Sequence, residues 1–455
     1  MQAVLSFCVL SLLLVIGKVL RTSIPFLRKL YLPSSLVAGA LGLLLLSFWG
    51  DGVLSGCHEG WTKLPGFLIN IVFATLFIGQ KFPKMSKVKN IVGEQLCFGQ
   101  IVAWGMYVVG IVVTMLVLVP LFNVPPVFGN LIEIGFSGGH GTVGGMQAVF
   151  EEMGWEAGSA LGYTTATVGM IIGVTVGMAL INSAVRKGEV KYIRSYEDLS
   201  KAEQRGFYPI NRRPSAGMQT VMCDSIDSLA WHLSVVGLAI LVGYFFKEGL
   251  LLLNGILPKS ISNLRIIESI PLFPLCMIGG LVIQQFLNAT RLSPLIDRGQ
   301  INRIGGASLD FLVVAAVSTI QLKFIAGNWL PLAILIFVGV AWSLFSANIL
   351  SKIMFKEDRF ERMICEFGQF TGVTATGLLL LRTADPESKT SASTAFGCKQ
   401  LFHEPIMGGG VWTAMAVPLV IKLGPWWVVL ISFAMMVIWW SVWYFFLRKG
   451  ADKTK

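Results

Sequence analysis

Two glycine-rich segments hold most of the residues that could bind a ligand. The first, GFSGGHGTVGG, spans 135–145, and the second, FGQFTGVTATG, spans 367–377. Glycine lets a ligand approach the backbone closely, while hydroxyl groups and exposed carbonyls are hard oxygen ligands for an alkali cation. The substrate-binding candidates of the first segment are Ser137, Gly138, Gly139, His140, Gly141 and Thr142. Those of the second are Thr371, Gly372 and Thr374, and the sodium-ligand candidates there are Thr374 and Thr376.

The first segment also permits other interpretations. Gly139, Gly141 and Gly144 have the G-x-G-x-x-G spacing of a loop that binds a dinucleotide pyrophosphate. Such a loop needs a βαβ unit in a soluble α/β domain, and no alternation of strand and helix patterns surrounds this one. Small residues are also common where membrane helices pack closely, so a structural role for the segment stays open. His140 could donate to a substrate carboxylate or only orient the loop.

Four ionisable residues near or within apolar runs are further candidates. Arg382 could pair with a substrate carboxylate, and it could equally be a loop charge. Asp310 is a candidate sodium ligand or proton site, unless it only partners a donor from another helix. His403 and Glu404 are also candidate sodium ligands, because the proline and glycines at 405–410 predict a helix break that exposes carbonyls.

The composition excludes an ordinary soluble domain. Hydrophobic residues make up 54% of the 455-residue chain and charged residues only 13%, against roughly a quarter in soluble domains. Apolar runs of about 17 to 25 residues recur, and each is long enough to cross a bilayer as a helix. We therefore predict an all-α polytopic membrane protein. Its expected spans are 3–20, 33–50, 65–80, 97–122, 158–185, 226–248, 269–290, 305–322, 329–351, 392–421 and 425–447.

The chain has a net charge of +11. The positions of its basic residues indicate membrane topology and no nucleic-acid partner. Basic residues gather after every odd-numbered span, including the segment 186–213 and the tail after 447. The positive-inside rule then places the N-terminus outside and the C-terminus in the cytoplasm. A bacterial inner membrane is the expected location. The seven cysteines are scattered and form no C-x-x-C pair, which argues against a disulfide or zinc framework.

The order of features along the chain predicts two inverted repeats. Five spans precede the polar segment and five follow it, and each half carries one glycine-rich segment before its last span. Because five is odd, the second half must enter the membrane from the opposite side. The charge pattern makes each glycine-rich segment begin and end on one side, as a re-entrant hairpin does. The predicted divisions are 1–185 with an outer hairpin at 123–157, a cytoplasmic linker at 186–225, 226–422 with a cytoplasmic hairpin at 356–390, and an extra helix with a basic tail at 423–455.

The chain resembles the bacterial sodium/glutamate symporter family over most of its length. The likeness is densest at SSLVAGALGLLLLSF, at GFSGGHGTVGG and at the following EEMGWEAGSALGYTTATVGMIIG. It implies sodium-driven uptake of glutamate or a related dicarboxylate, with sodium as coupling ion and no organic cofactor. It also implies a homodimer in which a transport domain carrying both hairpins moves against a scaffold that includes 33–50 and 269–290. The second segment, FGQFTGVTATG, departs from the family's pattern, as do Asp310, Arg382 and the pair His403 and Glu404.

We therefore expect a secondary active transporter, not an enzyme. We expect glutamate as the substrate and alternating access by an elevator mechanism. A carrier of another organic anion with the same fold, coupled to protons through Asp310 or Glu404, is the first alternative. An enzyme using His403 and Glu404 lacks a metal-binding spacing such as H-E-x-x-H. A channel fits two opposed hairpins less well than a carrier does.

Overall fold

In the computed structural model every regular element among the described residues is a helix, with no strand among them. These are residues 2–29, 32–49, 55–80, 85–190, 200, 204–208, 213–254, 270–385 and 389–448. Parts of the expected linker and the basic tail beyond 448 lie outside the described residues. The chain divides into two compact units, the first made of 1–81, 140–159 and 200–320, and the second of 82–139, 160–199 and 321–455.

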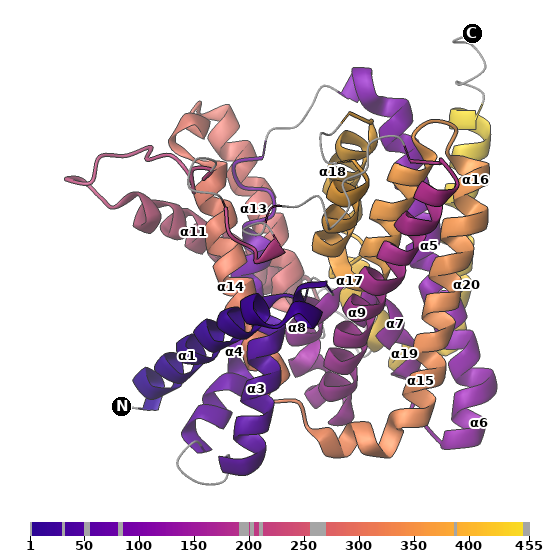
Figure 1. The fold of residues 1–455 in the computed structure, drawn as a ribbon, viewed down its shortest axis with the longest axis horizontal. Helices are drawn as coiled ribbons and strands as arrows, with labels where there is room; N and C mark the ends of the chain where they lie inside the picture. The colour runs from indigo at the N-terminus through magenta and orange to yellow at the C-terminus, as the bar shows by residue number, and fades with distance from the viewer. Residues whose placement is uncertain are drawn as a thin grey trace. The chain divides into compact units, whose positions relative to one another are not determined.

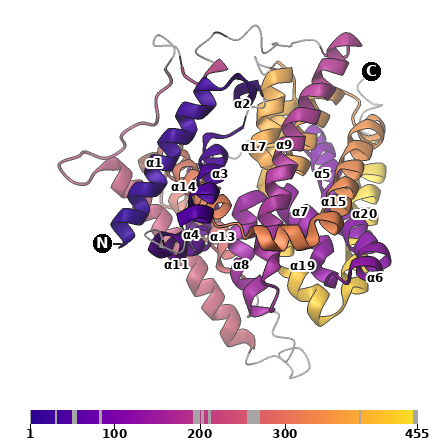
Figure 2. The same ribbon diagram turned by 60° about the horizontal axis from the view of Figure 1, so that its bottom comes forward.

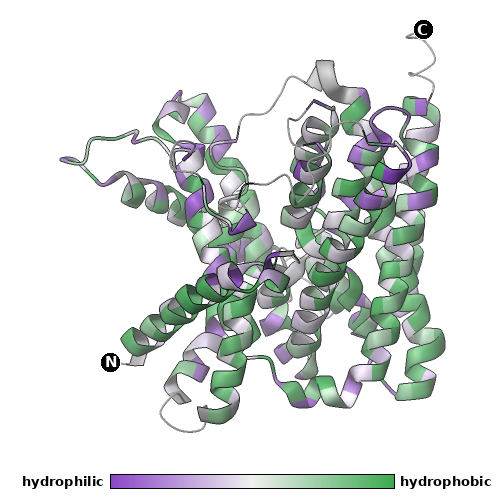
Figure 3. Ribbon diagram, viewed as in Figure 1, coloured by the Kyte–Doolittle hydropathy of each residue, from purple (hydrophilic) through white to green (hydrophobic). Residues whose placement is uncertain are grey.

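Nine helices of the described residues are long and apolar enough to cross a membrane, which confirms the polytopic helical class. In Figure 3 the ribbons of α1 (Gln2–Ser23) and α20 (Pro425–Val442) are hydrophobic along most of their length. Helices suit such runs because they satisfy every backbone group internally where no water is present.

One expected span matches its helix within a residue at each end, and two others differ from the helices that form. The span expected at 33–50 is α3 (Ser34–Trp49), a helix of 16 residues. The span expected at 65–80 is α4 (Ser55–Ala74), which begins earlier and gives way to a turn over 75–79. The span expected at 392–421 is two helices, α18 (Ala392–His403) and α19 (Val411–Lys422). A proline and three glycines lie between them, and both residue types disfavour a continuous helix.

The second glycine-rich segment forms a helical hairpin. α17 (Arg359–Ala384) has non-helical backbone angles at Gly372 and Val373. A Cβ on Gly368 would lie 2.7 Å from the Cα of Gly377, so the two limbs run back along each other. At 1.5 Å per residue, the limbs 359–371 and 374–384 are about 20 and 17 Å long. Neither limb covers a hydrocarbon core of about 30 Å, although α17 as a whole has the composition of a span.

Among the described residues, the first unit contains three long helices from each half of the chain, together with shorter helices of the first half. From the first half come α1, α3 and α4, followed by α8 (Gly139–Glu152). From the second half come α11 (Ser228–Asn254), α13 (Leu272–Ala289) and α14 (Arg298–Ser318). α1 packs on α3 as α11 packs on α13, and α3 packs on α14 as α13 packs on α4. The packing partners of the first set thus correspond in order to those of the second.

The second unit holds most of the other described helices. They are α5 (Met85–Val113), α6 (Val119–Phe122), α7 (Leu131–Phe136), α9 (Ala157–Arg186), α15 (Leu322–Phe345), α16 (Ser351–Met354), α17, α18, α19 and α20, with the first residues of α9 in the first unit. α5 continues through a π-helical turn at 114–118 into α6, and α15 continues through one at 346–350 into α16. α5 packs against both α15 and α20, and α9 lies along α17 (Figures 1 and 2).

Candidate functional site

The first glycine-rich segment forms a turn between α7 and α8. The N–H groups of Ser137 and Gly138 donate to the carbonyl of Glu133, at 3.1 and 3.0 Å. α8 begins at Gly139, whose φ of +67° lies in the left-handed region that favours glycine. The Ser137 hydroxyl is buried and has no hydrogen-bond partner. The element before this turn is a helix, so the dinucleotide interpretation is wrong.

The second turn is the tip of the α17 hairpin. Val373 has a φ of +65° and a ψ of 170°, a region that is essentially restricted to glycine. A β-branched residue keeps this strained conformation only where its surroundings hold it, and such strain clusters at functional sites. On either side of the tip, the Thr371 hydroxyl donates to the Phe367 carbonyl at 2.7 Å, and Thr376 is buried.

Both turns meet the break between α18 and α19 within the second unit. A Cβ on Gly139 would collide with the side chain of Val373, so the two tips touch. A Cβ on Gly408, in the break, would lie 3.5 Å from the Ser137 hydroxyl oxygen. Gly408 and Gly409 have φ values of +65° and +108°. Interrupted helices leave N–H and C=O groups without helical partners, so this meeting point can present backbone groups to a ligand.

Glu133 connects these elements as a fully buried carboxyl. It accepts a hydrogen bond from the Tyr107 hydroxyl at 2.7 Å and from the Gly408 N–H at 2.8 Å. The Thr413 hydroxyl lies 3.1 Å from the same carboxyl. One side chain on α7 therefore fixes the position of α5, of the break and of the start of α19.

A chain of polar side chains leads away from the tip of α17. The Thr374 hydroxyl donates to the Glu404 carboxyl at 3.1 Å, and Gln400 donates to the Thr374 oxygen at 2.7 Å. Gln369, on the other limb, donates to Gln400 at 3.2 Å. Thr374 and Glu404, both expected as sodium ligands, are thus in contact.

The same chain continues to a buried ion pair. The Lys399 ammonium lies 2.6 Å from the Gln369 carbonyl oxygen and 3.1 Å from a Glu366 oxygen, and the side chains of both ionic partners are 0% exposed. Gln95 donates to the other Glu366 oxygen at 2.7 Å. Arg362 donates to the Gln95 carbonyl oxygen at 2.9 Å. The pair is therefore enclosed by hydrogen-bonding side chains, as a buried ion pair requires.

Two aspartates close the base of the hairpin. Asp358, before the first limb, accepts from the N–H and hydroxyl of Ser391, both at 2.8 Å. Asp385, after the second limb, accepts from the N–H groups of Lys389 and Thr390 and from the Thr390 hydroxyl. Burial raises the pKa of Asp385, but these hydrogen bonds outweigh it and the pKa is lowered. Both ends of α17 are thereby held to the start of α18.

Two predicted residues do not join this meeting point. Arg382 is exposed near the end of the second limb, about 12 Å along the helix from Thr374. Asp310 belongs to α14 in the first unit, where it accepts a hydrogen bond from Ser35 on α3. The described residues hold no group of three or more His, Cys, Asp or Glu side chains that could bind a metal ion.

The remaining predicted residues divide between the two units. His140, Gly141 and Thr142 are buried in the first turn of α8, and a Cβ on Gly141 would lie 2.8 Å from Ile69 in the first unit. The boundary between the units falls directly after Gly139. His403 is buried at the end of α18 in the second unit. Thr371, Gly372, Thr374 and Thr376 are all in the second unit with Ser137, Gly138 and Gly139.

The sequence patterns did not single out Glu133, Lys399 or Glu366 as site residues. The available signal was a lysine in the apolar run 392–421 and a glutamate in FGNLIEIGF and in MICEFGQF. Charged residues in such runs are expensive unless they are paired. Their partners lie more than 25 residues away in the sequence, so the pairing itself was not visible there.

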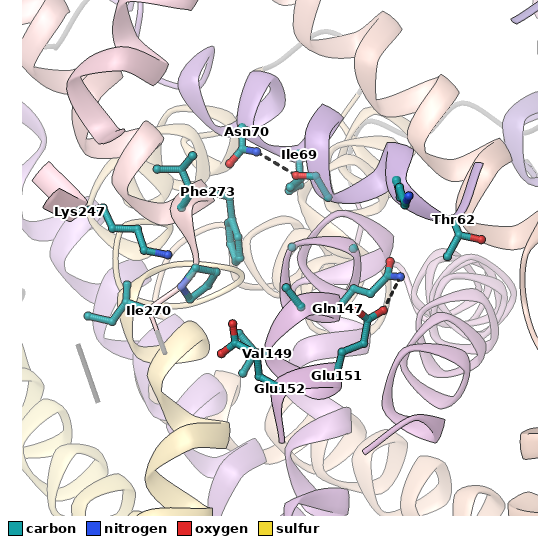
Figure 4. Close-up of a pocket in the computed structure, with 17 residues that line it drawn as sticks. Thr62, Ile69, Asn70, Gln147, Val149, Glu151, Glu152, Lys247, Ile270 and Phe273 are labelled. Carbon is teal, nitrogen blue, oxygen red and sulfur yellow. Dashed lines mark hydrogen bonds between the residues drawn. The ribbon is translucent and has the colours of Figure 1, made fainter. Parts of the chain in front are cut away.

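The first unit contains a separate cavity of about 360 Å³ (Figure 4). Lys247 and Glu152 are among its lining residues, together with Asn70 and Gln147. Gly144 and Gly145 on α8 also line it, but none of the predicted site residues does. The cavity is therefore distinct from the meeting point of the turns.

A unit of apolar helices, in which two helical turns and a helix break converge, defines a membrane transporter rather than a soluble binding domain. The family model for the sodium/glutamate symporter matches residues 1–378, and the chain belongs to this family. The family is one of transporters. No curated protein and no solved structure matches the chain. The matched residues include both turns and end within the second limb of α17, before α18, the helix break and α19.

Proposed function

We propose that this protein imports glutamate or a related small carboxylate by coupling it to sodium entry. The observation that carries the proposal is the contact between Gly139 and Val373 beside the glycines of the broken helix. The helices α8 and α19 and the second limb of α17 all begin at these interruptions. Helix N-termini attract anions because their first N–H groups have no helical partner. The Ser137 hydroxyl, buried beside Gly408, adds a donor for a substrate carboxylate.

Sodium would bind to oxygen atoms near the same turns. Thr374 and Glu404 are in contact, and Thr376 lies next to Gly372. Hydroxyl, carboxylate and carbonyl oxygens are the ligands that a hard cation prefers. We leave Arg382, which is exposed, and Asp310, which accepts a hydrogen bond from Ser35 within the first unit, out of the proposed sodium and substrate site.

We propose alternating access by an elevator movement, in which the second unit together with the first hairpin carries the site, and the other helices of the first unit are the scaffold. The helices of each unit support two inverted repeats, 1–185 and 226–422. The first three spans of each repeat are in the first unit, and α5 and α15, the fourth spans, are both in the second. Both fourth spans end in a π-helical turn, a rare feature that is frequent at functional sites. The two hairpins would be re-entrant from opposite faces.

The membrane orientation follows from the basic loops. The positive-inside rule supports an outer N-terminus and a cytoplasmic C-terminus in a bacterial inner membrane. In that orientation the α17 hairpin enters from the cytoplasm, and the turn before α8 is reached from outside. A homodimer is expected from the resemblance to the family.

Uptake of radiolabelled glutamate into proteoliposomes tests this function. We expect accumulation against the glutamate gradient under an inward sodium gradient, and competition by small dicarboxylates. Equal uptake under a potassium gradient, or none for any dicarboxylate, would refute sodium-coupled carboxylate transport. His140→Ala and Gly141→Val test the first turn, since unchanged uptake in both variants would remove that turn from the site.

One observation favours a second candidate, a proton-coupled carrier of another organic anion. Glu404 contacts the hairpin tip, yet it lies beyond the residues that match the family. A carboxyl at this place could carry a proton instead of binding sodium. Uptake driven by a pH gradient in sodium-free buffer, and lost in Glu404→Gln, would establish this candidate over sodium coupling.

A further inference from the structure

The ammonium of Lys399 is a fully enclosed charge in the second unit. It is 0% exposed, and α18, which carries it, packs between α5 and α17. An unpaired ammonium in such a place would cost many kcal/mol, so its surroundings must be built to hold a cation.

The surroundings have the composition of a monovalent cation site. Glu366 supplies a carboxylate oxygen at 3.1 Å and Gln369 an amide oxygen at 2.6 Å. The rings of Phe370 and Phe396 lie 5.2 and 5.6 Å from the ammonium, within the range of a cation–π attraction.

The backbone also leaves room for the ammonium. A Cβ on Gly99 of α5 would lie 2.9 Å from the Lys399 nitrogen and would collide with the neighbouring methylene. A glycine on the facing helix therefore makes space for the end of the lysine side chain. Both oxygens come from the first limb of the hairpin, while the lysine comes from the helix that follows the second limb.

Both side chains that supply these oxygens also have hydrogen-bond partners other than the lysine. Gln95 donates to Glu366 at 2.7 Å, and Arg362 in turn donates to Gln95. Gln369 also donates to Gln400, which donates to Thr374 at the hairpin tip. Three successive contacts thus link the Lys399 ammonium to Thr374, at the turn that we assign to ligand binding.

We propose that Lys399 is a tethered cation that fills a monovalent-cation site in the second unit, so that this site needs no free ion. Ammonium and alkali cations take the same hard oxygen ligands, and here the covalent tether supplies the charge permanently. Shortening the lysine would open the site to sodium. The expected effect of Lys399 on transport rests on the proposed sodium-coupled function. The existence of the cation site does not.

Sodium titration of thermal stability tests the site without transport. The full-length Lys399→Ala variant would be purified in detergent, and its apparent melting temperature measured while sodium chloride replaces choline chloride at constant ionic strength. We expect a sodium-dependent rise of several degrees beyond that of the wild type, because a ligand that binds only the folded state stabilises it. The double variant Lys399→Ala/Glu366→Gln should lose this additional rise. Lys352→Ala, which removes an exposed lysine from α16, should behave as the wild type.

Three results would refute the proposal that Lys399 fills a monovalent-cation site. They are a Lys399→Ala variant with no additional sodium response, an equal response in the double variant, and aggregation of Lys399→Ala in every salt. In proteoliposomes, the Hill coefficient for sodium should rise by about one in Lys399→Ala, a change that a merely structural role would not produce. A wild type that transports no glutamate would refute the proposed function, and the thermal titration would still decide the cation site.

Discussion

Because the two limbs of α17 are in contact, we expect two Gly→Ala substitutions to change the stability of the protein in opposite directions. A Cβ on Gly368 would lie 2.7 Å from the Cα and 2.8 Å from the N of Gly377. Carbon atoms prefer separations of about 3.5–4.0 Å, so the limbs would have to separate by about 1 Å. A Cβ on Gly397, in the exposed part of α18, meets nothing within 4 Å.

The expected free energies follow from two opposing effects. Replacing glycine by alanine inside a helix stabilises it by roughly 0.8–1 kcal/mol. Overpacking against a neighbour costs about 1–3 kcal/mol, and here the neighbour is backbone that cannot rotate away. Gly397→Ala should therefore stabilise the protein by up to ~1 kcal/mol, and Gly368→Ala should destabilise it by up to ~2 kcal/mol. The gain in helix propensity cancels in the difference between the variants, which isolates the clash at about 1–3 kcal/mol.

Thermal unfolding of the purified variants at one scan rate measures this difference. Tryptophan fluorescence is a suitable signal, because the chain has 13 tryptophans. Gly377→Ala should resemble Gly368→Ala, since its Cβ would collide with the carbonyl oxygen of Cys365. If Gly368→Ala were as stable as Gly397→Ala, the limbs could not be packed backbone to backbone, and the hairpin would be refuted.

Glu133→Leu would remove the acceptor of three hydrogen bonds and should destabilise the protein by about 3–6 kcal/mol, whereas Tyr107→Phe, which removes one donor, should cost about 1 kcal/mol in the same thermal assay. Equal effects of the two variants would contradict the shared role of the carboxyl. Gly139→Ala and Gly154→Ala both place a side chain at a φ near +70°, at a strain of about 1–2 kcal/mol, but only the first collides with the opposing tip. Glutamate uptake should therefore fall at least tenfold in Gly139→Ala and remain near wild type in Gly154→Ala. Equal uptake by the two variants would contradict the contact between the two tips. The lowered pKa of Asp385 means that its ionised form stabilises the fold above the unfolded-state pKa near 3.8, and that this contribution is lost as the pH falls through the lower folded-state value. The difference in melting temperature between the wild type and Asp385→Ala should accordingly shrink from pH 6 towards pH 3, and a difference that grew on acidification would contradict the hydrogen bonds at the base of the hairpin.

Much of the fold could be predicted because its signals are local. Apolar runs of the right length indicated the helical membrane class, and the structure confirms it. The proline and glycines after His403 predicted the break between α18 and α19, which forms at 404–410. The end of α4 was harder to place, because the run to residue 80 is apolar and its turn over 75–79 depends on packing. There Arg298 of α14 donates to the carbonyls of Thr75 and Ile78.

The candidate site was predicted in part. The two glycine-rich segments form the turns, because glycine is the residue that tolerates close backbone approach and positive φ. The contact between Thr374 and Glu404 brings together two of the expected sodium ligands. Arg382 and Asp310 were proposed on the basis of charge alone, and charge does not report which face or which unit a side chain occupies.

The sequence by itself determined where the helices run, where they are interrupted and which residues could serve a ligand at the interruptions. These properties depend on hydrophobic length and on the backbone freedom of glycine and proline, and neither needs knowledge of the partner. Only the tertiary structure decided that Val373 opposes Gly139, that Glu133 accepts from Gly408, and that Lys399 is enclosed beside Glu366. Such pairs join residues 33 to 275 positions apart. Their geometry depends on how separate helices pack, and no local spacing encodes that packing.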